Sequence, residues 1–312
     1  MPWATFARAT NRSISQRRRG RREGNHRSWL ALTLTGPSQS FAPSASLRES
    51  GPCPGLAVTS LPSSQLCARW VSGAEEDELE ATEGCSVKRV QSGEVETVED
   101  TLVVESHVAI EIDGEGLIRT TCSPAQLREW VIGHLFSEGR IACPEDVAEI
   151  RETDGVFSVE LSVSAPPEPG PLTPIESGWR ATPDRILAVA RETAEKAELF
   201  HRTGGTHAMA LADAAEIVAF VEDISRTCAL EKALGMALLE GAELSRCFAF
   251  LSSRAPSRMI EKLARCGVPI VAAVSAPTID AVRLAEELNV CLCGFVRGER
   301  LNVYAGGWRL GL

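Results

Sequence analysis

A pair of glycines followed by a histidine is the first place in this sequence where chemistry can be expected. The stretch FHRTGGTHAMAL, residues 200–211, places Gly204, Gly205 and His207 between a polar segment and an apolar, strand-like run. Glycine pairs permit positive φ values or a close approach of the backbone to another group. On these residues alone the simpler explanation is a tight loop whose histidine packs locally, and a ligand site is the alternative.

Further polar stretches follow four apolar runs that are typical of buried strands. They contain Arg226, Arg254, Arg297 and Arg300, and the guanidinium group of arginine is a rigid, permanently charged fork that suits phosphate. If the strands are parallel, these stretches meet at one edge of the sheet, where helix N-termini add N–H donors. The pattern predicts a site for an anionic, nucleotide-like ligand; polar junctions that merely solvate the rim are the alternative. The candidate ligand-binding residues are Gly204, Gly205, His207, Arg254, Ser275, Phe295, Val296, Arg297, Gly298, Glu299 and Arg300.

The elements that must position these residues alternate between strand and helix. Near-continuous apolar runs predict strands over 216–223, 247–252, 268–275 and 290–296, with helices over 182–200, 227–241, 257–267 and 278–289. Such runs are typical of strands covered by helices on both faces. Alternation of this kind predicts an α/β fold with a mainly parallel sheet.

The preceding part of the chain predicts a smaller α+β region over residues 85–165. Two hairpins are indicated, one turning at Asp113-Gly114, and between them lies a helix with Ser123 as its N-cap and Gly139 at its end. Residues 166–181 are proline-rich and predict a loop. Residues 182–312 form the expected α/β cofactor-binding region. Residues 1–84 predict a disordered extension, or a wrongly assigned start, because they are rich in Arg, Ser, Pro and Gly.

Composition restricts the function further. The net charge is −10, yet residues 1–30 hold eight Arg and one Glu, so the remainder carries −17. Such a body repels nucleic acid, and no apolar run is long enough for a membrane helix. We therefore expect neither nucleic acid nor a membrane as a partner, and we expect a cytoplasmic location.

None of the ten cysteines forms a C-x-x-C motif, which argues against a zinc ribbon or a dithiol redox motif. No metal cluster is indicated; Cys291 and Cys293 are expected to be buried on one face of a strand.

Several blocks in order resemble the FdhD/NarQ family of formate dehydrogenase accessory sulfurtransferases. They include FHRTGGTHAMAL, VEDISRTCALEKALG, and the run from LSSRAPSRMIEKLARCG to GFVRGERLNVY, and the resemblance spans residues 101–309. The resemblance implies a fold akin to cytidine deaminases. It also implies transfer of sulfur, as a persulfide, from a cysteine desulfurase to a molybdenum or tungsten bis(molybdopterin guanine dinucleotide) cofactor for formate dehydrogenase. The glycine pair, His207 and the segment Phe295–Arg300 would then contact this cofactor or a GDP-like nucleotide, and a homodimer is a possible assembly.

The sequence departs from the family pattern where sulfur chemistry would occur. The family carries a C-x-x-C-G motif in the loop that here is PPEPGPLTPIESGW, residues 166–179, which holds no cysteine. The thiolate is the nucleophile in persulfide chemistry, and serine cannot replace it. Cys228 is the best substitute, because it is expected near a helix N-terminus; a buried structural cysteine is the alternative. No other catalytic residue matches.

Three functions follow from these observations. The first is an accessory sulfurtransferase that uses another cysteine. The second is a degenerate member that holds the cofactor, or the dehydrogenase, without moving sulfur. The third is an unrelated nucleotide enzyme on the same fold.

Overall fold

The computed structural model describes residues 69–72, 81–162 and 169–312. A five-stranded sheet has the order β1-β6-β7-β4-β5. Its strands are β1 (Arg69–Ser72), β4 (Ser106–Ile112), β5 (Glu115–Cys122), β6 (Val147–Thr153) and β7 (Val156–Leu161). Strand β1 pairs with β6 in parallel, so part of the predicted extension belongs to this sheet. Most of that extension, residues 1–68 and 73–80, lies outside the described residues.

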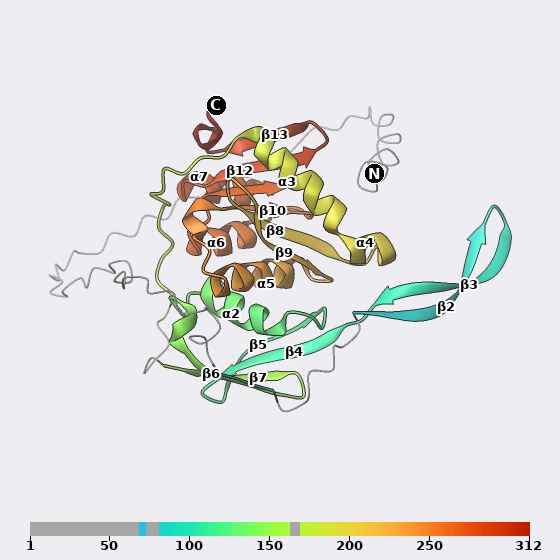
Figure 1. Cartoon of the computed structure of the whole chain (residues 1–312). Coiled ribbons are helices and arrows are strands. Elements are labelled where there is room, and N and C mark those ends of the chain that lie inside the picture. Colours follow the sequence, from blue (N-terminus) through green and yellow to red (C-terminus); the bar gives the residue numbers. More distant parts are fainter. Residues whose placement is uncertain (1–68, 73–80, 163–168) are drawn as a thin grey trace, which may run out of the picture. The chain divides into compact units, whose positions relative to one another are not determined.

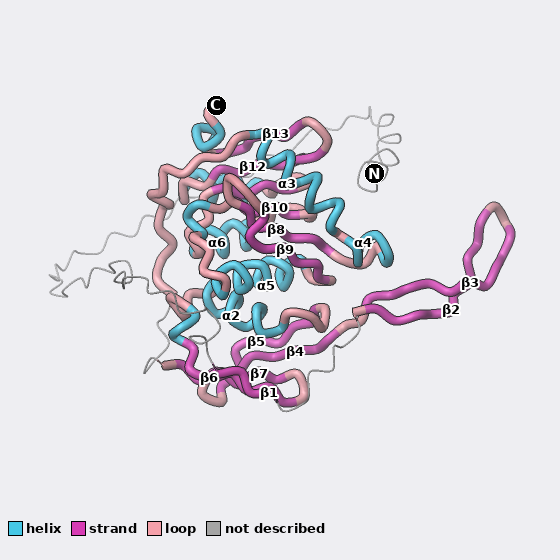
Figure 2. The backbone as a smooth tube through the Cα atoms, in the orientation of Figure 1, coloured by secondary structure: helices cyan, strands magenta, loops and turns pink. Residues whose placement is uncertain are grey.

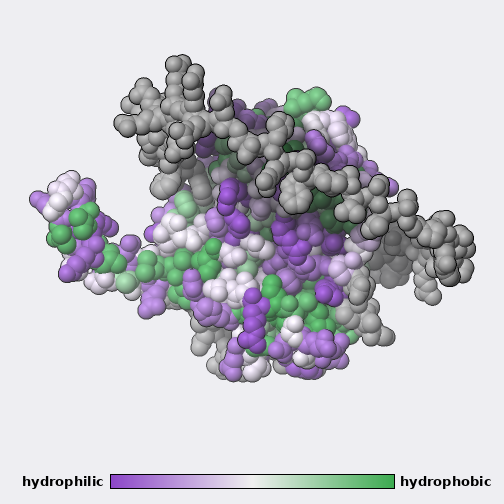
Figure 3. Space-filling model, turned by 180° about the vertical axis from the view of Figure 1, so that it is seen from behind, coloured by the Kyte–Doolittle hydropathy of each residue, from purple (hydrophilic) through white to green (hydrophobic). Residues whose placement is uncertain are grey.

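Both predicted hairpins are present in this region, one of them with the predicted turn at Asp113-Gly114. Asp113 and Gly114 have φ values of 52° and 79°, and Asp154 and Gly155 have values of 51° and 75°. These left-handed pairs match the right-handed twist of the flanking strands. A further hairpin, β2 (Thr82–Gln91) and β3 (Glu94–Val103), precedes β4 and was not among the two predicted hairpins. Figure 3 shows apolar residues on this hairpin, where Val90 and Val95 are exposed.

The second sheet has six strands in the order β13-β12-β11-β10-β8-β9. They are β8 (His207–Ala212), β9 (Ile217–Asp223), β10 (Phe248–Leu251), β11 (Ile270–Ala273), β12 (Cys291–Arg297) and β13 (Arg300–Ala305). Strands β10, β11 and β12 pair in parallel, and β8 is antiparallel to both β10 and β9. Strands β9 to β12 therefore share one direction, as predicted, while β8 and β13 run against them.

Helices cover both faces of this six-stranded sheet (Figure 1). Helix α3 (Pro183–Lys196) packs on one face together with Phe248, Phe250, Cys291 and Cys293. Helices α5 (Arg226–Leu239), α6 (Ser257–Arg265) and α7 (Ile279–Glu287) pack on the other face, against Leu251 and Leu292 among others. The strict alternation of these side chains confirms that Cys291 and Cys293 are buried on one side. These results confirm the α/β fold class.

Helix α2 (Leu127–Ser137) joins the two regions by packing on α5 (Figure 2). Gly133 and Gly235 lie at the crossing, where the two backbones approach too closely for any side chain. The predicted end at Gly139, with φ 69°, is confirmed. The predicted N-cap is wrong: the cap residue is Gln126, because Ser123 is bound to the end of β9, where its backbone N–H donates to Asp223 at 3.1 Å.

The predicted helix over 182–200 is interrupted. Thr182 caps α3 as expected, but α3 ends at Lys196, and a separate helix α4 (Glu198–Thr203) follows. The carboxylate of Glu222 on β9 accepts hydrogen bonds from the backbone N–H groups of Leu199 and Phe200 at 2.9 and 2.8 Å. This side chain satisfies the free donors of the first turn of α4 and fixes the segment that leads into the glycine pair.

The described part of the proline-rich loop is held against the α/β region by hydrogen bonds, chiefly from the buried Arg309. Arg309, in the final 3-10 turn (Gly307–Leu310), donates from its guanidinium group to the carbonyl oxygens of Ser177 and Trp179, at 2.6 and 3.1 Å. The backbone N–H of Ile175 also donates to the Leu288 carbonyl oxygen at 2.9 Å. Residues 175–179 are therefore fixed against the end of α7.

Candidate functional site

The sheet topology brings the predicted ligand-binding residues to one edge. Strands β9 to β12 share a direction, and His207, the first residue of antiparallel β8, pairs with Asp223, the last residue of β9. We call the carboxyl ends of β9, β10, β11 and β12, with the start of β8, the candidate edge. Ligands of open α/β sheets bind at such an edge.

The glycine pair and His207 lie at this edge with their backbone fixed. Gly204 ends α4 with φ 67°, a conformation that glycine adopts without strain. A Cβ on Gly205 would lie 3.0 Å from the Val103 side chain. The Nδ1 atom of His207 is buried and has no hydrogen-bond partner among the described residues. Burial lowers the pKa of His207, and the positive charge of Arg226 lowers it further. The ring is therefore neutral at pH 7 and can form a hydrogen bond with a ligand.

The end of β10 adds two ordered serines and one exposed arginine. Ser252 is not free, because its Oγ accepts a hydrogen bond from the backbone N–H of Ala208 at 2.9 Å. Ser253 donates to the carbonyl oxygen of Arg254 at 3.0 Å. The side chain of Arg254 is exposed, which leaves its guanidinium group available to an anion.

The end of β12 is shaped by an unusual backbone. Phe295 has φ 54°, and its N–H donates to the Ser275 carbonyl oxygen at 3.3 Å. Non-glycine residues in this conformation are uncommon and often mark functional segments. The guanidinium carbon of Arg297 lies 5.7 Å from the centre of the Phe295 ring.

The remaining predicted residues of this segment have different environments. Gly298 and Glu299 are exposed in the turn, and Arg300 begins β13 opposite Arg297. Val296 is 1% exposed and packs in the core on the α3 side, so only its backbone is available to a ligand.

A buried ion pair between Lys232 and Asp223 lies next to the candidate edge and was not predicted from the sequence. Lys232 Nζ lies 2.6 Å from Asp223 Oδ2 and donates to the Ser123 carbonyl oxygen at 2.7 Å; both charged side chains are fully buried. The other carboxylate oxygen of Asp223 accepts from the Ser225 N–H at 2.7 Å. The pair thus holds together β9, the start of α5 and the segment after β5. A signal was present, since Glu231-Lys232 interrupts an otherwise apolar helix sequence.

A second buried network lies between α2, α5 and α6. Glu231 accepts a hydrogen bond from Trp130 Nε1 at 2.8 Å, and its other carboxylate oxygen lies 3.0 Å from Nδ1 of the buried His134. His134, Glu138 and Glu231 could together ligate a metal ion. However, Lys262 Nζ lies 2.7 Å from Glu231 Oε1 and also bonds Glu138. The Lys262 ammonium group therefore occupies the position where a metal ion would have to lie.

The charge of Lys262 also lowers the pKa of the neighbouring Glu138. Burial raises the pKa of Glu138, but hydrogen bonds and charge attraction from Lys262 and Arg258 outweigh it and lower the pKa to about 2. Burial likewise opposes ionisation of Glu231, whose pKa is lowered by His134 and Lys262. Both carboxylates are therefore charged at neutral pH and pair with cations.

Cys228 lies in the first turn of α5, as predicted, but it is only 2% exposed. Its thiol faces Thr120, whose Oγ1 is 3.8 Å from Sγ, instead of solvent. A large protein donor cannot reach this sulfur in the described conformation.

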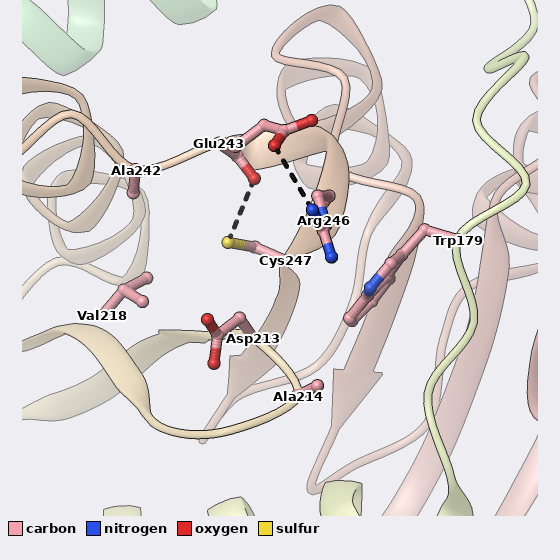
Figure 4. A pocket seen from close by; sticks show the side chains of 8 residues that line it. All are labelled: Trp179, Asp213, Ala214, Val218, Ala242, Glu243, Arg246 and Cys247. Carbon is pink, nitrogen blue, oxygen red and sulfur yellow. Dashed lines mark hydrogen bonds and ion pairs between the residues drawn. The ribbon is translucent and has the colours of Figure 1, made fainter. Parts of the chain in front are cut away.

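A cavity of about 320 Å³ lies at the opposite edge, before β10 (Figure 4). Trp179, Asp213, Arg246 and Cys247 are among its lining residues. Burial is the main cause that raises the pKa of Cys247 to about 11, and the negative charges of Asp213 and Glu243 add to it. The thiol is therefore a poor nucleophile, and this cavity is not the predicted site.

The fold and the candidate edge define an α/β protein with an arginine-rich edge suited to an anionic ligand. The chain belongs to the FdhD/NarQ family, whose family model matches residues 103–171 and 168–311. Among the described residues, no helix is both long and apolar enough to cross a membrane.

Named relatives support the assignment. The chain is 36% identical over 263 residues to the "Sulfur carrier protein FdhD" of Anaeromyxobacter dehalogenans, with 69% of this chain and 90% of that protein covered. It is 29% identical over 252 residues to the protein of the same name from Listeria innocua, with 72% and 97% covered. A crystal structure described as a formate dehydrogenase accessory protein from Desulfotalea psychrophila has the same fold, with a TM-score of 0.65, 23% identity, and 74% and 99% of the two chains covered.

Proposed function

We propose that this protein assists the maturation of formate dehydrogenase by holding a molybdenum or tungsten bis(molybdopterin guanine dinucleotide) cofactor at the candidate edge. The names of its relatives, a sulfur carrier protein and a formate dehydrogenase accessory protein, support this role. The observation that carries the proposal is the gathering of Arg226, Arg254 and Arg297 at one sheet edge, beside the N-terminus of α5.

The residues at this edge fit the guanine nucleotide end of such a cofactor. Arg254 and Arg297 offer planar forks for phosphate oxygens, and the free N–H groups of the first turn of α5 favour negative charge. The buried Nδ1 of His207 lacks a partner among the described residues, and a bound nucleotide would supply one. The cofactor would bring the metal and its sulfur ligands; the chain contributes binding and orientation.

The sulfur-transfer step of the family is not part of this proposal. Residues 166–179 hold no cysteine, and Arg309 fixes the backbone of residues 177 and 179. Cys228 is buried away from any protein donor. A cofactor-holding role, without relay of sulfur by a cysteine desulfurase through this loop, is the function that these residues support best.

Binding of GDP tests the proposal, because GDP carries the guanine and phosphate groups of the cofactor. We expect Arg254→Ala and Arg297→Ala each to weaken binding by about 1–3 kcal/mol, the range for a lost charge-assisted hydrogen bond. Isothermal titration calorimetry measures this difference. Arg246→Ala is the matched control, since this arginine lies at the opposite edge and should leave affinity unchanged. No binding by the unmodified chain, or full affinity in both edge variants, would reject the site.

A further inference from the structure

The hairpin of β2 and β3 has no packing partner along its outer part. Its two strands pair without a register shift and close through Ser92 and Gly93, which have φ values of 54° and 89°. No residue of either strand is fully buried, and Val90 and Val95, directly opposite each other at the tip, are 69% and 63% exposed. In Figures 1 and 2 no other labelled element lies beside the outer half of the hairpin. Because an isolated hairpin is at most marginally stable in water, further strands would stabilise this one.

The outer edge of β2 offers a row of backbone groups to such a strand. Thr101 lies opposite Gly84, but its N–H donates to the Asp100 carboxylate at 2.9 Å. Opposite residues of an antiparallel pair alternate between hydrogen-bonded and non-hydrogen-bonded. The residues of β2 whose N–H and C=O groups point away from β3 are therefore Gly84, Ser86, Lys88 and Val90. Within residues 81–162 and 169–312, β2 pairs with no strand except β3, so this row is a template for another strand.

The outer edge of β3 is protected by its acidic side chains against pairing with a copy of itself. In antiparallel self-pairing, every register that pairs most of β3 places two acidic side chains directly opposite each other. Like charges in that position are destabilising, and charged side chains commonly protect strand edges. The acidic residues concerned are Glu94, Glu96, Glu99 and Asp100.

Strand β2 can pair with a copy of itself without this conflict. An antiparallel register centred on Ser86 places Glu83 opposite Arg89 of the second copy, and twofold symmetry repeats the ion pair. The same register pairs every outward-pointing residue of the row. A register centred on Lys88 would instead place that lysine opposite itself. Arg89 is available for this contact, because its side chain is 52% exposed beside Glu96.

We propose that a second copy of this chain docks on the outer edge of β2, so that two hairpins form a four-stranded antiparallel sheet. The interface is isologous, with the twofold axis at Ser86. The tip of each hairpin, with Val90, then lies beside Thr82 at the base of the other. Thr82 accepts a hydrogen bond from Arg202 of α4 at 3.2 Å, so the partner reaches the segment that leads into the glycine pair. This inference does not depend on the proposed cofactor.

The mass of the full chain in solution, measured by light scattering after size-exclusion chromatography, tests the proposal. We expect twice the mass of one chain. Ser86→Pro removes an outward N–H at the centre of the interface and should give the mass of one chain; proline is tolerated where the N–H of an edge strand faces solvent. Glu99→Pro is the matched control, because Glu99 lies opposite Ser86 on the other edge and its replacement should leave the dimer intact. The mass of one chain for the unmodified protein at every concentration, or a dimer that survives Ser86→Pro, would overturn the proposal.

A disulfide placed on the twofold axis tests the register. The two copies of Ser86 form a hydrogen-bonded pair in this register, with Cα atoms about 5.5 Å apart, which is within the range of a disulfide. Ser86→Cys is made together with Cys85→Ser, which removes the exposed native thiol of the hairpin. After mild oxidation, peptide mapping should find residue 86 of most chains linked to residue 86 of a second chain, and dithiothreitol should reverse the link. Glu99→Cys in the same background should form no such link. Absence of the link at residue 86, or equal linkage at residue 99, would contradict the proposed interface.

Discussion

Gly133→Ala and Gly235→Ala should each destabilise the protein severely. A Cβ on Gly133 would lie 1.7 Å from the Glu231 carbonyl oxygen, and one on Gly235 would lie 1.9 Å from the Glu129 carbonyl oxygen. Both obstacles are helix backbone and cannot turn away, so α2 and α5 must separate. We expect a loss of about 3 kcal/mol or more in the free energy of unfolding, at the upper end for overpacking. Urea denaturation followed by circular dichroism measures this loss.

Gly116→Ala is the matched control for these variants. Gly116, in β5, has no atom within 4 Å of an added Cβ, so its replacement should leave the free energy of unfolding nearly unchanged. The double variant at Gly133 and Gly235 should lose less than the sum of the two single losses, because one separation of the helices relieves both clashes. Near-wild-type stability of either single variant would show that the helices do not cross at these glycines.

Lys232→Met should cost about 3–5 kcal/mol, because it leaves the Asp223 carboxylate buried without a counter-charge. Both side chains are fully buried, and the Nζ–Oδ2 distance of 2.6 Å indicates a direct pair. The same denaturation measurement applies. The double variant Asp223→Asn/Lys232→Met should recover part of the loss, since it removes both charges and keeps one acceptor for the backbone N–H groups.

An exposed ion pair provides the control for this effect. Arg283 and Asp280 lie 3.5 Å apart on α7 with most of their side-chain surface exposed. Arg283→Met should change stability by less than about 1 kcal/mol, as is usual for surface pairs. A cost for Lys232→Met as small as that for Arg283→Met would contradict the role of the buried pair.

The strand and helix positions of the α/β region were predictable because the local signals are strong there. Apolar runs such as those of β11 and β12 are bounded by Gly, Pro or Thr, and buried strands have this pattern. The placement of Arg254 and Arg297 at one edge followed from the shared strand direction. The antiparallel insertion of β8 was not predictable, since strand direction depends on pairing with distant segments and not on local composition.

The errors arose where a distant partner competes with a local signal. Ser123 has the sequence signature of an N-cap, but Asp223, a hundred residues away, takes its backbone N–H, and the helix begins later. The ligand-binding roles of His207 and of the Phe295–Arg300 segment remain predictions.

Formate dehydrogenase activity in a bacterial host that lacks its own member of this family tests the central claim most directly. The sulfur carrier protein of Anaeromyxobacter dehalogenans serves as the positive control, and immunoblotting verifies that both proteins accumulate. We expect this chain to restore no activity above background, because residues 166–179 offer no thiol for a persulfide. A variant with the family C-x-x-C-G motif in that loop then tests whether the missing thiol alone is responsible. Full activity with the unmodified chain, abolished by Cys228→Ala, would contradict the account and show that Cys228 carries the sulfur.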